Sequence, residues 1–447
     1  MNNKSVKGSM ISGNPAKELI IFAIPMILGN LFQQFYNIAD SVIVGKFLGP
    51  DALAAVGASN SITTLFVMVA IGTGIGCSVI ISQLFGAGRM KDVKSSISTA
   101  LIAIFVFSLI LSTIGFMFSG NILKWMHTPS DVYEEADKYL KIYFLGFAFL
   151  FMYNAFNAVF NALGDSAKPL VFLIFSSVLN IGLDILFVWK FEWGVAGAAW
   201  ATLIAQAVSA IISFIVLIHK IRGMQCERYD RFSPGLLKKM VSMAIPTVIQ
   251  QSIVSIGLLL IQSVVNRFGS DFLAGYTAAI KIDNLVIVPM VNVGNAVSTF
   301  TAQNIGAGKF DRVKKGYRTG LIMAAAIGVA LGIWLHFGSE SVIGLFMDAD
   351  DGAAAIHVGT EYLSIISLQY FMMGMMNVTA AILRGAGDKK WFLAQSLINL
   401  VFRVALVYIL ADITKGYVIM WASGVGWTIG FMISYFRYRQ GGWRRCI

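Results

Sequence analysis

Twelve long apolar runs divide the chain and constrain its fold more than any other feature. Each is long enough to cross about 30 Å of hydrocarbon as a helix. They lie at residues 19–46, 55–86, 96–123, 139–163, 169–189, 194–218, 238–266, 274–305, 317–337, 358–383, 391–411 and 417–436. A backbone that faces lipid must satisfy its own hydrogen bonds, and the runs are continuous where a β-barrel would need many short alternating segments. The sequence therefore predicts an all-α integral membrane protein with twelve transmembrane helices.

The distribution of charge predicts the orientation of these helices. Only 13% of the residues are charged, compared with about 25% in soluble domains. The loops on the side of the amino terminus, together with both tails, hold most of the 34 Lys and Arg residues. Because basic loops stay in the cytoplasm, we expect a multi-pass protein of the cell (inner) membrane with both termini cytoplasmic and no secretory signal. The net charge of +11 then reflects topology and attraction to anionic lipid, and nucleic acid is not an expected partner.

The chain contains an internal repeat, displaced by about 220 residues. "FAIPMIL" (22–28) matches "MAIPTVI" (243–249), and "QLFGAGRMKDVK" (83–94) matches "QNIGAGKFDRVK" (303–314). Six helices in each repeat is an even number, so the two halves should have the same orientation in the membrane. Two pseudo-symmetric lobes of six helices are therefore expected.

The boundaries of these lobes follow from the apolar runs. We expect an N-terminal lobe at residues 1–218, a basic cytoplasmic connector at 219–237 and a C-terminal lobe at 238–447. Pro25 and Pro246 occupy matching positions in the first helix of each lobe. Each proline removes a backbone hydrogen bond, so both helices should be kinked there.

Charged residues well inside the apolar runs, away from their ends, are the strongest functional signal. They are Asp40, Asp184, Lys281, Asp283 and Arg403. Each costs roughly 2.5–3.5 kcal/mol when placed at the centre of a membrane helix, so all should face a cavity or one another.

The first half gathers acids and amides in its spans, which predicts a polar site. Its members are Asp40, Asn154, Asn157, Asn180, Asp184 and Thr202. Asn180 and Asp184 are one turn apart and share a helix face. A hydrogen-bonded network that only fixes helix packing is one interpretation. The other is a coupling site, in which neighbouring buried carboxylates take up a proton, or in which the same oxygens surround Na⁺.

The second half departs from this pattern. Gln262 occupies the position equivalent to Asp40, and Arg403 the position equivalent to Asp184. Lys281 and Asp283 are two residues apart and so point to different faces of one helix. We expect these charges to form a structural ion pair, such as one between Asp283 and Arg403, or to act as a gate.

A substrate cavity is predicted from aromatic, amide and methionine residues on the first, seventh and tenth spans. The candidates are Phe32, Gln34, Tyr36, Gln250, Gln251 and Met376. Aromatic and methionine side chains accommodate varied apolar ligands, although the same residues also serve ordinary packing.

Two other signals bear on the class of protein. "GTGIG" (72–76) resembles part of a nucleotide-binding loop, but it lies inside an apolar run with no preceding strand, which favours close helix packing. No arrangement of nucleophile and base, and no cluster of metal ligands, stands out. We therefore expect neither an enzyme nor a cofactor other than a coupling ion.

The paired prolines, the paired Q-x-x-G-A-G-[RK] segments and the two parallel halves resemble the multidrug and toxic compound extrusion (MATE) transporters, in particular their DinF-like branch. The resemblance implies a V-shaped fold with a central cavity, working as a monomer. It implies a cation-coupled antiporter that exports amphipathic, cationic or aromatic compounds by alternating access.

The resemblance also implies roles for individual residues. Asp40 would be the main coupling carboxylate, with Asn180, Asp184 and Thr202 as partners, and these four would be the ligands if the ion is Na⁺. The seventh span has no acid, and neither has "LQYFMMGMMNVTAAIL" (368–383) in the tenth, which favours H⁺. The alternative function is a flippase for lipid-linked oligosaccharides, a related group with a similar helical plan.

Overall fold

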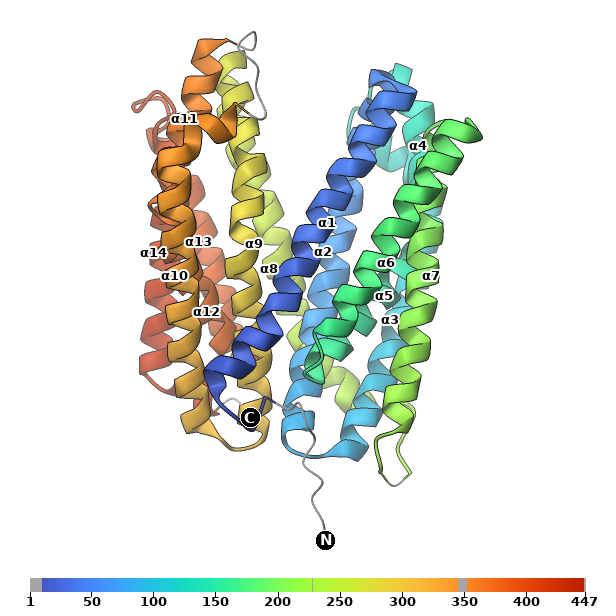
Figure 1. The fold of residues 1–447 in the computed structure, drawn as a ribbon, viewed down its shortest axis with the longest axis vertical. Helices are drawn as coiled ribbons and strands as arrows, with labels where there is room; N and C mark the ends of the chain where they lie inside the picture. The colour runs from blue at the N-terminus through green and yellow to red at the C-terminus, as the bar shows by residue number, and fades with distance from the viewer. Residues whose placement is uncertain (1–9, 227, 345–351, 446–447) are drawn as a thin grey trace. The chain divides into compact units, whose positions relative to one another are not determined.

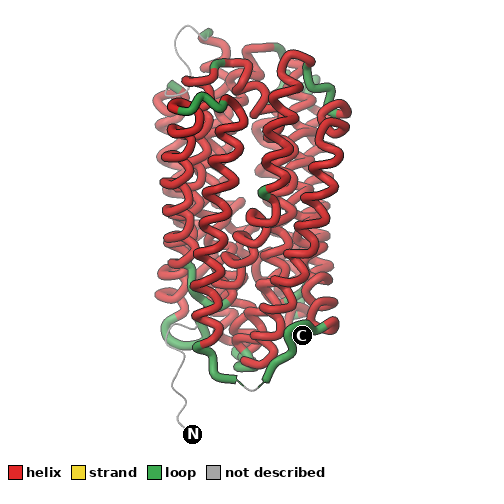
Figure 2. The backbone as a smooth tube through the Cα atoms, turned by 90° about the vertical axis from the view of Figure 1, so that its right-hand side faces the viewer, coloured by secondary structure: helices red, strands yellow, loops and turns green. Residues whose placement is uncertain are grey.

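A computed structural model describes residues 10–226, 228–344 and 352–445, and within these ranges all regular structure is helical (Figure 2). The first half contains α1 (Pro15–Leu48), α2 (Pro50–Gly86), α3 (Met90–Trp125), α4 (Ser130–Leu145), α5 (Phe147–Ala162), α6 (Ala167–Asp184), the π-helix η1 (Ile185–Lys190) and α7 (Gly194–Arg222). The second contains α8 (Pro234–Val265), η2 (Asn266–Phe268), α9 (Ser270–Gly306), α10 (Phe310–Ile343), α11 (Ala353–Ser367), α12 (Tyr370–Ala386), α13 (Lys389–Leu410), α14 (Val418–Arg439) and η4 (Gly442–Arg445) (Figure 1). The prediction of an all-α protein is confirmed.

The number of membrane spans agrees with the sequence, but two spans are broken. Ten described helices are long and apolar enough to cross a membrane, and the count reaches twelve when each of two bent pairs is one span. These pairs are α4 with α5, bent by 49°, and α11 with α12, bent by 51°. At the second bend, the side-chain amide of Gln369 donates to the carbonyl of Ile365 at 3.1 Å. This bond satisfies a carbonyl next to the helix end, where backbone partners are missing.

The internal repeat is visible in the turns that join equivalent helices. Gly49 precedes α2 with φ 87° and Gly269 precedes α9 with φ 91°. Gly88 and Gly308, which follow α2 and α9, both have φ 69°. Only glycine adopts this left-handed region without strain, so the repeated glycines set the same two turns in each half.

The structure divides the chain into two compact units at places other than the expected boundaries. The N-unit is Leu28–Val248, and the C-unit is Met1–Ile27 together with Ile249–Ile447. The first half of α1 therefore belongs with the second repeat, and the first half of α8 with the first repeat. Pro25 and Pro246 lie inside these two helices, and each lies two residues before the change of unit.

Side-chain packing explains this exchange of helix ends. Leu19 and Phe22 of α1 are buried in a C-unit cluster that includes Phe300 and Trp443. Met240 of α8 is buried in an N-unit cluster with Phe147 of α5. Burial of these apolar side chains stabilises each helix end within the unit that it enters.

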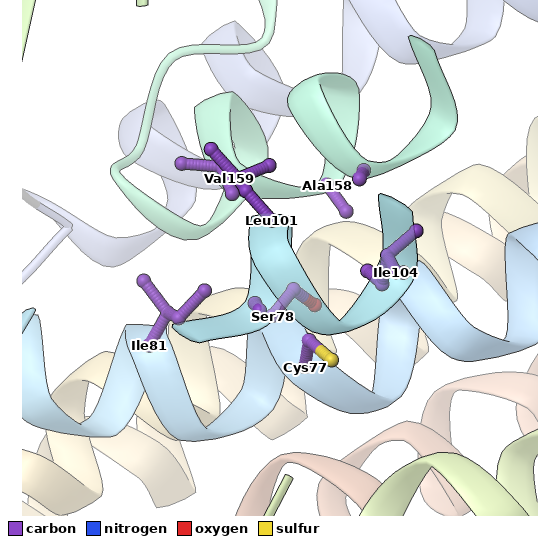
Figure 3. Close-up of a pocket in the computed structure, with 10 residues that line it drawn as sticks. Cys77, Ser78, Ile81, Leu101, Ile104, Ala158 and Val159 are labelled. Atoms are coloured by element: carbon purple, nitrogen blue, oxygen red, sulfur yellow. The ribbon is translucent and has the colours of Figure 1, made fainter. Parts of the chain in front are cut away.

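The glycines of residues 72–76 serve helix packing, as predicted. A Cβ atom added to Gly76 would collide with the backbone of Ala244 in α8, and one added to Gly72 would lie 2.7 Å from Cα of Val248. On the neighbouring face of α2, Cys77 and Ser78 line a narrow apolar gap with Ile104 of α3 and Ala158 of α5 (Figure 3). Small residues therefore let α2 approach α8 closely within the N-unit.

Candidate functional site

The N-unit brings together four of the predicted site residues from three helical spans. Asp40 lies on α1, Asn180 and Asp184 lie on α6, and Thr202 lies on α7. Asp184 is the last residue of α6, and the π-helix η1 begins directly after it. π-helical turns within longer helices occur frequently at functional sites. Asp184 is fully buried, and Asn180 is 1% exposed.

The carboxyl groups of Asp40 and Asp184 are close enough to interact with each other. Oδ1 of Asp40 and both oxygens of Asp184 are buried and have no hydrogen-bond partner in the described part of the chain. The salt bridges found among the described residues include neither acid. Buried polar atoms are nearly always paired, so this group of oxygens has capacity for a bound proton or cation.

An amide, a hydroxyl and aromatic rings complete the surroundings of the two acids. Nδ2 of Asn180 donates to Oγ1 of Thr202 at 3.4 Å, whereas Oδ1 of Asn180 is buried without a partner among the described residues. The hydroxyl of Tyr36 lies next to Thr202 and near Asp40. Tyr139, on α4, also lies near Asp40. The site therefore combines acidic, amide and hydroxyl oxygens with phenol rings.

Sequence reasoning missed Tyr139 as a neighbour of the site. It stacks on Tyr143 with ring centroids 6.2 Å apart and is 8% exposed. The two tyrosines are four residues apart on one helix face, and this spacing was the available signal.

Asn154 and Asn157 make no hydrogen bond to Asp40 or Asp184 among the described residues. Nδ2 of Asn154 donates to the carbonyl of Leu150 in its own helix at 2.9 Å. Oδ1 of Asn157 is buried without a hydrogen-bond partner in the described ranges.

The C-unit has a different polar centre. The hydroxyl of Tyr370 donates to Oδ1 of Asp283 at 2.7 Å, and Asp283 is 6% exposed. Arg403 is near enough to interact electrostatically with Asp283, but the described residues contain no ion pair between them within 4 Å, and Nε of Arg403 is buried without a hydrogen bond. Lys281 is exposed, on a different face of α9 from Asp283. The expected pairing of Asp283 with Arg403 is thus replaced by a hydrogen bond from Tyr370, because α12 places that hydroxyl closer.

The predicted cavity residues are divided between the two units. Phe32, Gln34 and Tyr36 belong to the N-unit, and Phe32 is 45% exposed. Gln250, Gln251 and Met376 belong to the C-unit. Oε1 of Gln250 is buried with no hydrogen-bond partner among the described residues, and Sδ of Met376 accepts from Nδ2 of Asn399 at 3.3 Å.

The chemistry of the N-unit site suits a small hard cation. The described residues contain no group of three or more His, Cys, Asp or Glu that could hold a transition metal. Carboxylate, amide and hydroxyl oxygens are the ligands preferred by hard cations. Two carboxyl groups in contact can also share one proton.

Comparison with known proteins gives the family. A model described as MatE matches residues 25–186 and 246–409. The probable multidrug resistance protein YpnP of Bacillus subtilis is 31% identical over 437 residues, covering 97% of this chain and 96% of that protein. YoeA, a second probable multidrug resistance protein of the same organism, is 29% identical over 442 residues, covering 96% and 94%.

The fold comparison agrees. The structure of a MOP superfamily transporter from Pyrococcus furiosus matches with a TM-score of 0.92 at 24% identity, covering 99% of this chain and all of that one. The two ranges matched by the family model fall one in each half of the chain, as the internal repeat predicts. The resemblance to the MATE transporters and the all-α membrane fold class inferred from the sequence are confirmed: the chain belongs to the MatE family, whose members are membrane transporters and not enzymes.

Proposed function

We propose that this chain is a cation-coupled exporter of amphipathic compounds, working by alternating access, with H⁺ as the coupling ion. It acts as a monomer in the cell membrane with both termini in the cytoplasm. The single observation that supports this function is the group of buried, unpaired oxygens around Asp40 and Asp184. A site of this kind is costly to maintain inside a membrane protein unless an ion occupies it during function.

Geometry favours a proton at this site. Asp40 and Asp184 interact directly, and one proton between two carboxyl groups turns their repulsion into a hydrogen bond. Na⁺ is the second candidate, with Asp40, Asn180, Asp184 and Thr202 as its ligands. The C-unit supports H⁺ indirectly, because both of its buried acids among the described residues have partners: Asp283 accepts a hydrogen bond from Tyr370, and Asp388 pairs with Arg437.

The energetics are sufficient for export. One charge crossing 100 mV supplies about 2.3 kcal/mol, and each pH unit supplies about 1.4 kcal/mol. A single proton entering under both gradients can therefore sustain a concentration ratio of roughly several hundred for an uncharged compound. For a monovalent cation the ratio is about tenfold per proton, because the outward charge cancels the contribution of the membrane potential.

Coupling would act through α1. Asp40 lies on the part of α1 that belongs to the N-unit, and the helix changes unit two residues after Pro25. Uptake of a proton changes the interaction of α1 with α6, and it shifts the conformational equilibrium by the difference in proton affinity between the two states. Release of the exported compound outwards is the step that we assign to the protonated state.

The exported compounds are proposed to be cationic or aromatic amphipathic molecules. Two relatives of similar length are named probable multidrug resistance proteins. Phe32 and Tyr36, with Met376 in the C-unit, supply aromatic and thioether groups that accommodate varied apolar ligands.

Reconstituted vesicles test the proposal. Efflux of a panel of cationic and aromatic dyes is measured while a pH gradient and a Na⁺ gradient are imposed separately. Efflux driven by the pH gradient supports H⁺ coupling, and efflux driven only by the Na⁺ gradient reassigns the ion. A response to neither gradient contradicts the coupled-exporter function.

A lipid-linked oligosaccharide flippase is the second candidate. The partly buried guanidinium of Arg403, whose Nε lacks a hydrogen-bond partner among the described residues, is the observation that favours an anionic head group. Flipping of a fluorescent anionic lipid in the same vesicles, with no effect on dyes, would select this function.

A further inference from the structure

A pocket of about 410 Å³ in the C-unit lies apart from the polar centres described above. It is formed by the first residues of α1 and the early turns of α10, which lie side by side in Figure 1. Its lining residues are Asn14, Pro15, Ala16, Lys315, Arg318, Thr319 and Ile322. The pocket therefore combines two cations, an amide and a hydroxyl with three apolar side chains.

The two cations of the pocket are available to a ligand. Lys315 and Arg318 are three residues apart on α10, so they share a helix face, and both are exposed. Neither takes part in an ion pair or hydrogen bond found in the described part of the chain.

The neighbouring basic residues, in contrast, already form ion pairs or hydrogen bonds with other residues of the chain. Lys314 pairs with Asp311 at 2.8 Å. Arg312 donates to the carbonyls of Met10, Ser12 and Gly13 at 2.8 to 3.1 Å. Lys309 donates to the carbonyl of Ile11 at 2.9 Å. The free charge at this end of α10 is thus concentrated in the pocket.

An apolar track continues from the pocket along the membrane-spanning part of both helices. Ile322, one turn after Arg318, is 62% exposed, and Val329 and Ile333 of α10 are also exposed. On α1, Ile21 and Ile24 are exposed in the same way. Cations at the end of a span with exposed apolar side chains beyond them match the phosphate and acyl chains of a phospholipid.

The repeat supplies an internal comparison, because the equivalent place in the N-unit is closed by the chain itself. Extending the match between residues 83–94 and 303–314 pairs Ser95 with Lys315, Ser98 with Arg318 and Thr99 with Thr319.

In the N-unit these positions are occupied by the connector. The hydroxyl of Ser98 donates to the carbonyl of Arg231 at 2.6 Å, and the backbone N–H of Ser233 donates to Oγ1 of Thr99 at 2.9 Å. In the C-unit, Asn14 precedes a proline as Ser233 does, but its side chain accepts from the N–H of Ala16. The hydrogen bonds found among the described residues include none between Asn14 and Thr319, and the pocket lies in this place.

We propose that this pocket binds one anionic phospholipid, whose phosphate lies between Lys315 and Arg318 and whose acyl chains follow the apolar track on α10. The site would belong to the membrane leaflet on the side of the basic loops. It is independent of the coupling site, because none of its lining residues belongs to the N-unit.

Native mass spectrometry of the full chain in detergent tests this site. The protein is titrated with phosphatidylglycerol or with phosphatidylcholine, and bound lipids are counted as mass increments. We expect one phosphatidylglycerol to bind more tightly than the rest. In a Lys315→Gln/Arg318→Gln variant, its affinity should fall by about thirtyfold, as expected when two cations beside an anionic head group are removed.

Two further variants keep the test specific. Lys238→Gln/Lys239→Gln removes the same charge from α8 in the N-unit and should leave the tight site unchanged. Thr319→Phe keeps the charge but fills the pocket, and it should also weaken the tight site. All variants are compared by size-exclusion chromatography to confirm folding.

The remaining outcomes contradict the proposal. Equal binding of phosphatidylcholine, or an equal loss in the α8 variant, would show that the lipid binds without using this pocket. If inorganic phosphate displaced the tight phosphatidylglycerol from the wild-type protein at equal concentration, the pocket would be a site for a soluble anion and not for a lipid.

Discussion

The polar centres of the two units are built on the same repeat but have opposite hydrogen-bonding states. In the N-unit, Asp40 and Asp184 interact with each other, and their buried oxygens lack partners among the described residues. In the C-unit, Asp283 accepts a hydrogen bond from Tyr370 at 2.7 Å. Arg403 occupies the position equivalent to Asp184. The N-unit thus has a pair of acids with buried oxygens that lack hydrogen-bond partners among the described residues. The C-unit has an acid that accepts a hydrogen bond, together with a cation.

This difference indicates that the two halves of one fold can have different roles, with ion coupling in the N-unit and structural stability in the C-unit. A buried carboxylate with a good donor contributes to a fixed structure, whereas two facing carboxylates require a mobile ion. Substitutions in one unit should therefore affect transport, and equivalent substitutions in the other should affect stability.

The largest effect is expected from Asp40→Asn in the N-unit. The amide cannot take up a proton, so dye efflux driven by a pH gradient should fall to the rate of protein-free vesicles. The matched control is Asp283→Asn, which should keep efflux near the wild-type rate because its Oδ1 still accepts from Tyr370. Equal losses in both variants would remove the distinction between the units.

The next effect is expected at an ion pair within the C-unit. Oδ2 of Asp388 lies 2.7 Å from Nε of Arg437, and their side chains are 5% and 20% exposed. Asp388→Ala leaves a largely buried guanidinium without its partner, which should lower the free energy of unfolding by about 3 kcal/mol. Thermal unfolding of the purified protein measures this loss, and an unchanged melting temperature would contradict it.

Tyr370→Phe tests the contribution of the hydrogen bond between Tyr370 and Asp283 to the stability of the C-unit. Removal of the hydroxyl leaves Asp283 buried without its donor, which should cost about 1–3 kcal/mol of stability. Tyr435→Phe is the control: Tyr435 is 39% exposed, and no hydrogen bond of its hydroxyl is found among the described residues, so stability should change by less than about 0.5 kcal/mol. If both variants unfolded at the same temperature, the hydrogen bond to Asp283 would not support the C-unit.

The smallest effect is expected at Asp165, whose oxygen lies 2.7 Å from Nζ of Lys220. Burial raises the pKa of Asp165, but the hydrogen bond and charge of Lys220, together with Lys168, lower it below its usual value of 3.8. A depressed pKa means that the stabilisation is complete above the unfolded-state value and is lost as the pH falls through the folded-state value.

The Asp165→Asn variant checks this pH dependence. It should lose about 1 kcal/mol or less at pH 7, because the pair is partly exposed. The difference in melting temperature from the wild type should disappear as the solution is acidified below the pKa of Asp165. A difference that grew on acidification would have the wrong sign.

Much of the fold follows from the sequence because the apolar runs and repeated glycines are local signals. The bends between α4 and α5 and between α11 and α12 escaped prediction, because both parts of each bent span are apolar. The unit boundaries also differed from expectation. They fall inside α1 and α8, where hydropathy does not change and only the packing of Leu19 or Met240 reveals the neighbour.

The candidate site was also predicted only in part from the sequence. The rarity of charge inside a membrane span identified Asp40 and Asp184, and helical spacing added Asn180. The roles assigned to these residues remain predictions. Tyr139 lies near Asp40, about 100 positions away in the chain. The hydrogen bond from Tyr370 to Asp283 joins residues 87 positions apart. Such contacts depend on how separate helices pack.

The sequence by itself determined the membrane-spanning helical class, the duplication and the family, because length, hydropathy and repeated motifs are properties of the chain. Only the tertiary structure decided which acids are satisfied, which helix ends change unit and where the basic pocket of α10 lies open. The physical reason is that hydrogen bonding and burial depend on the positions of several helices at once, and the chain order of residues does not specify those positions directly.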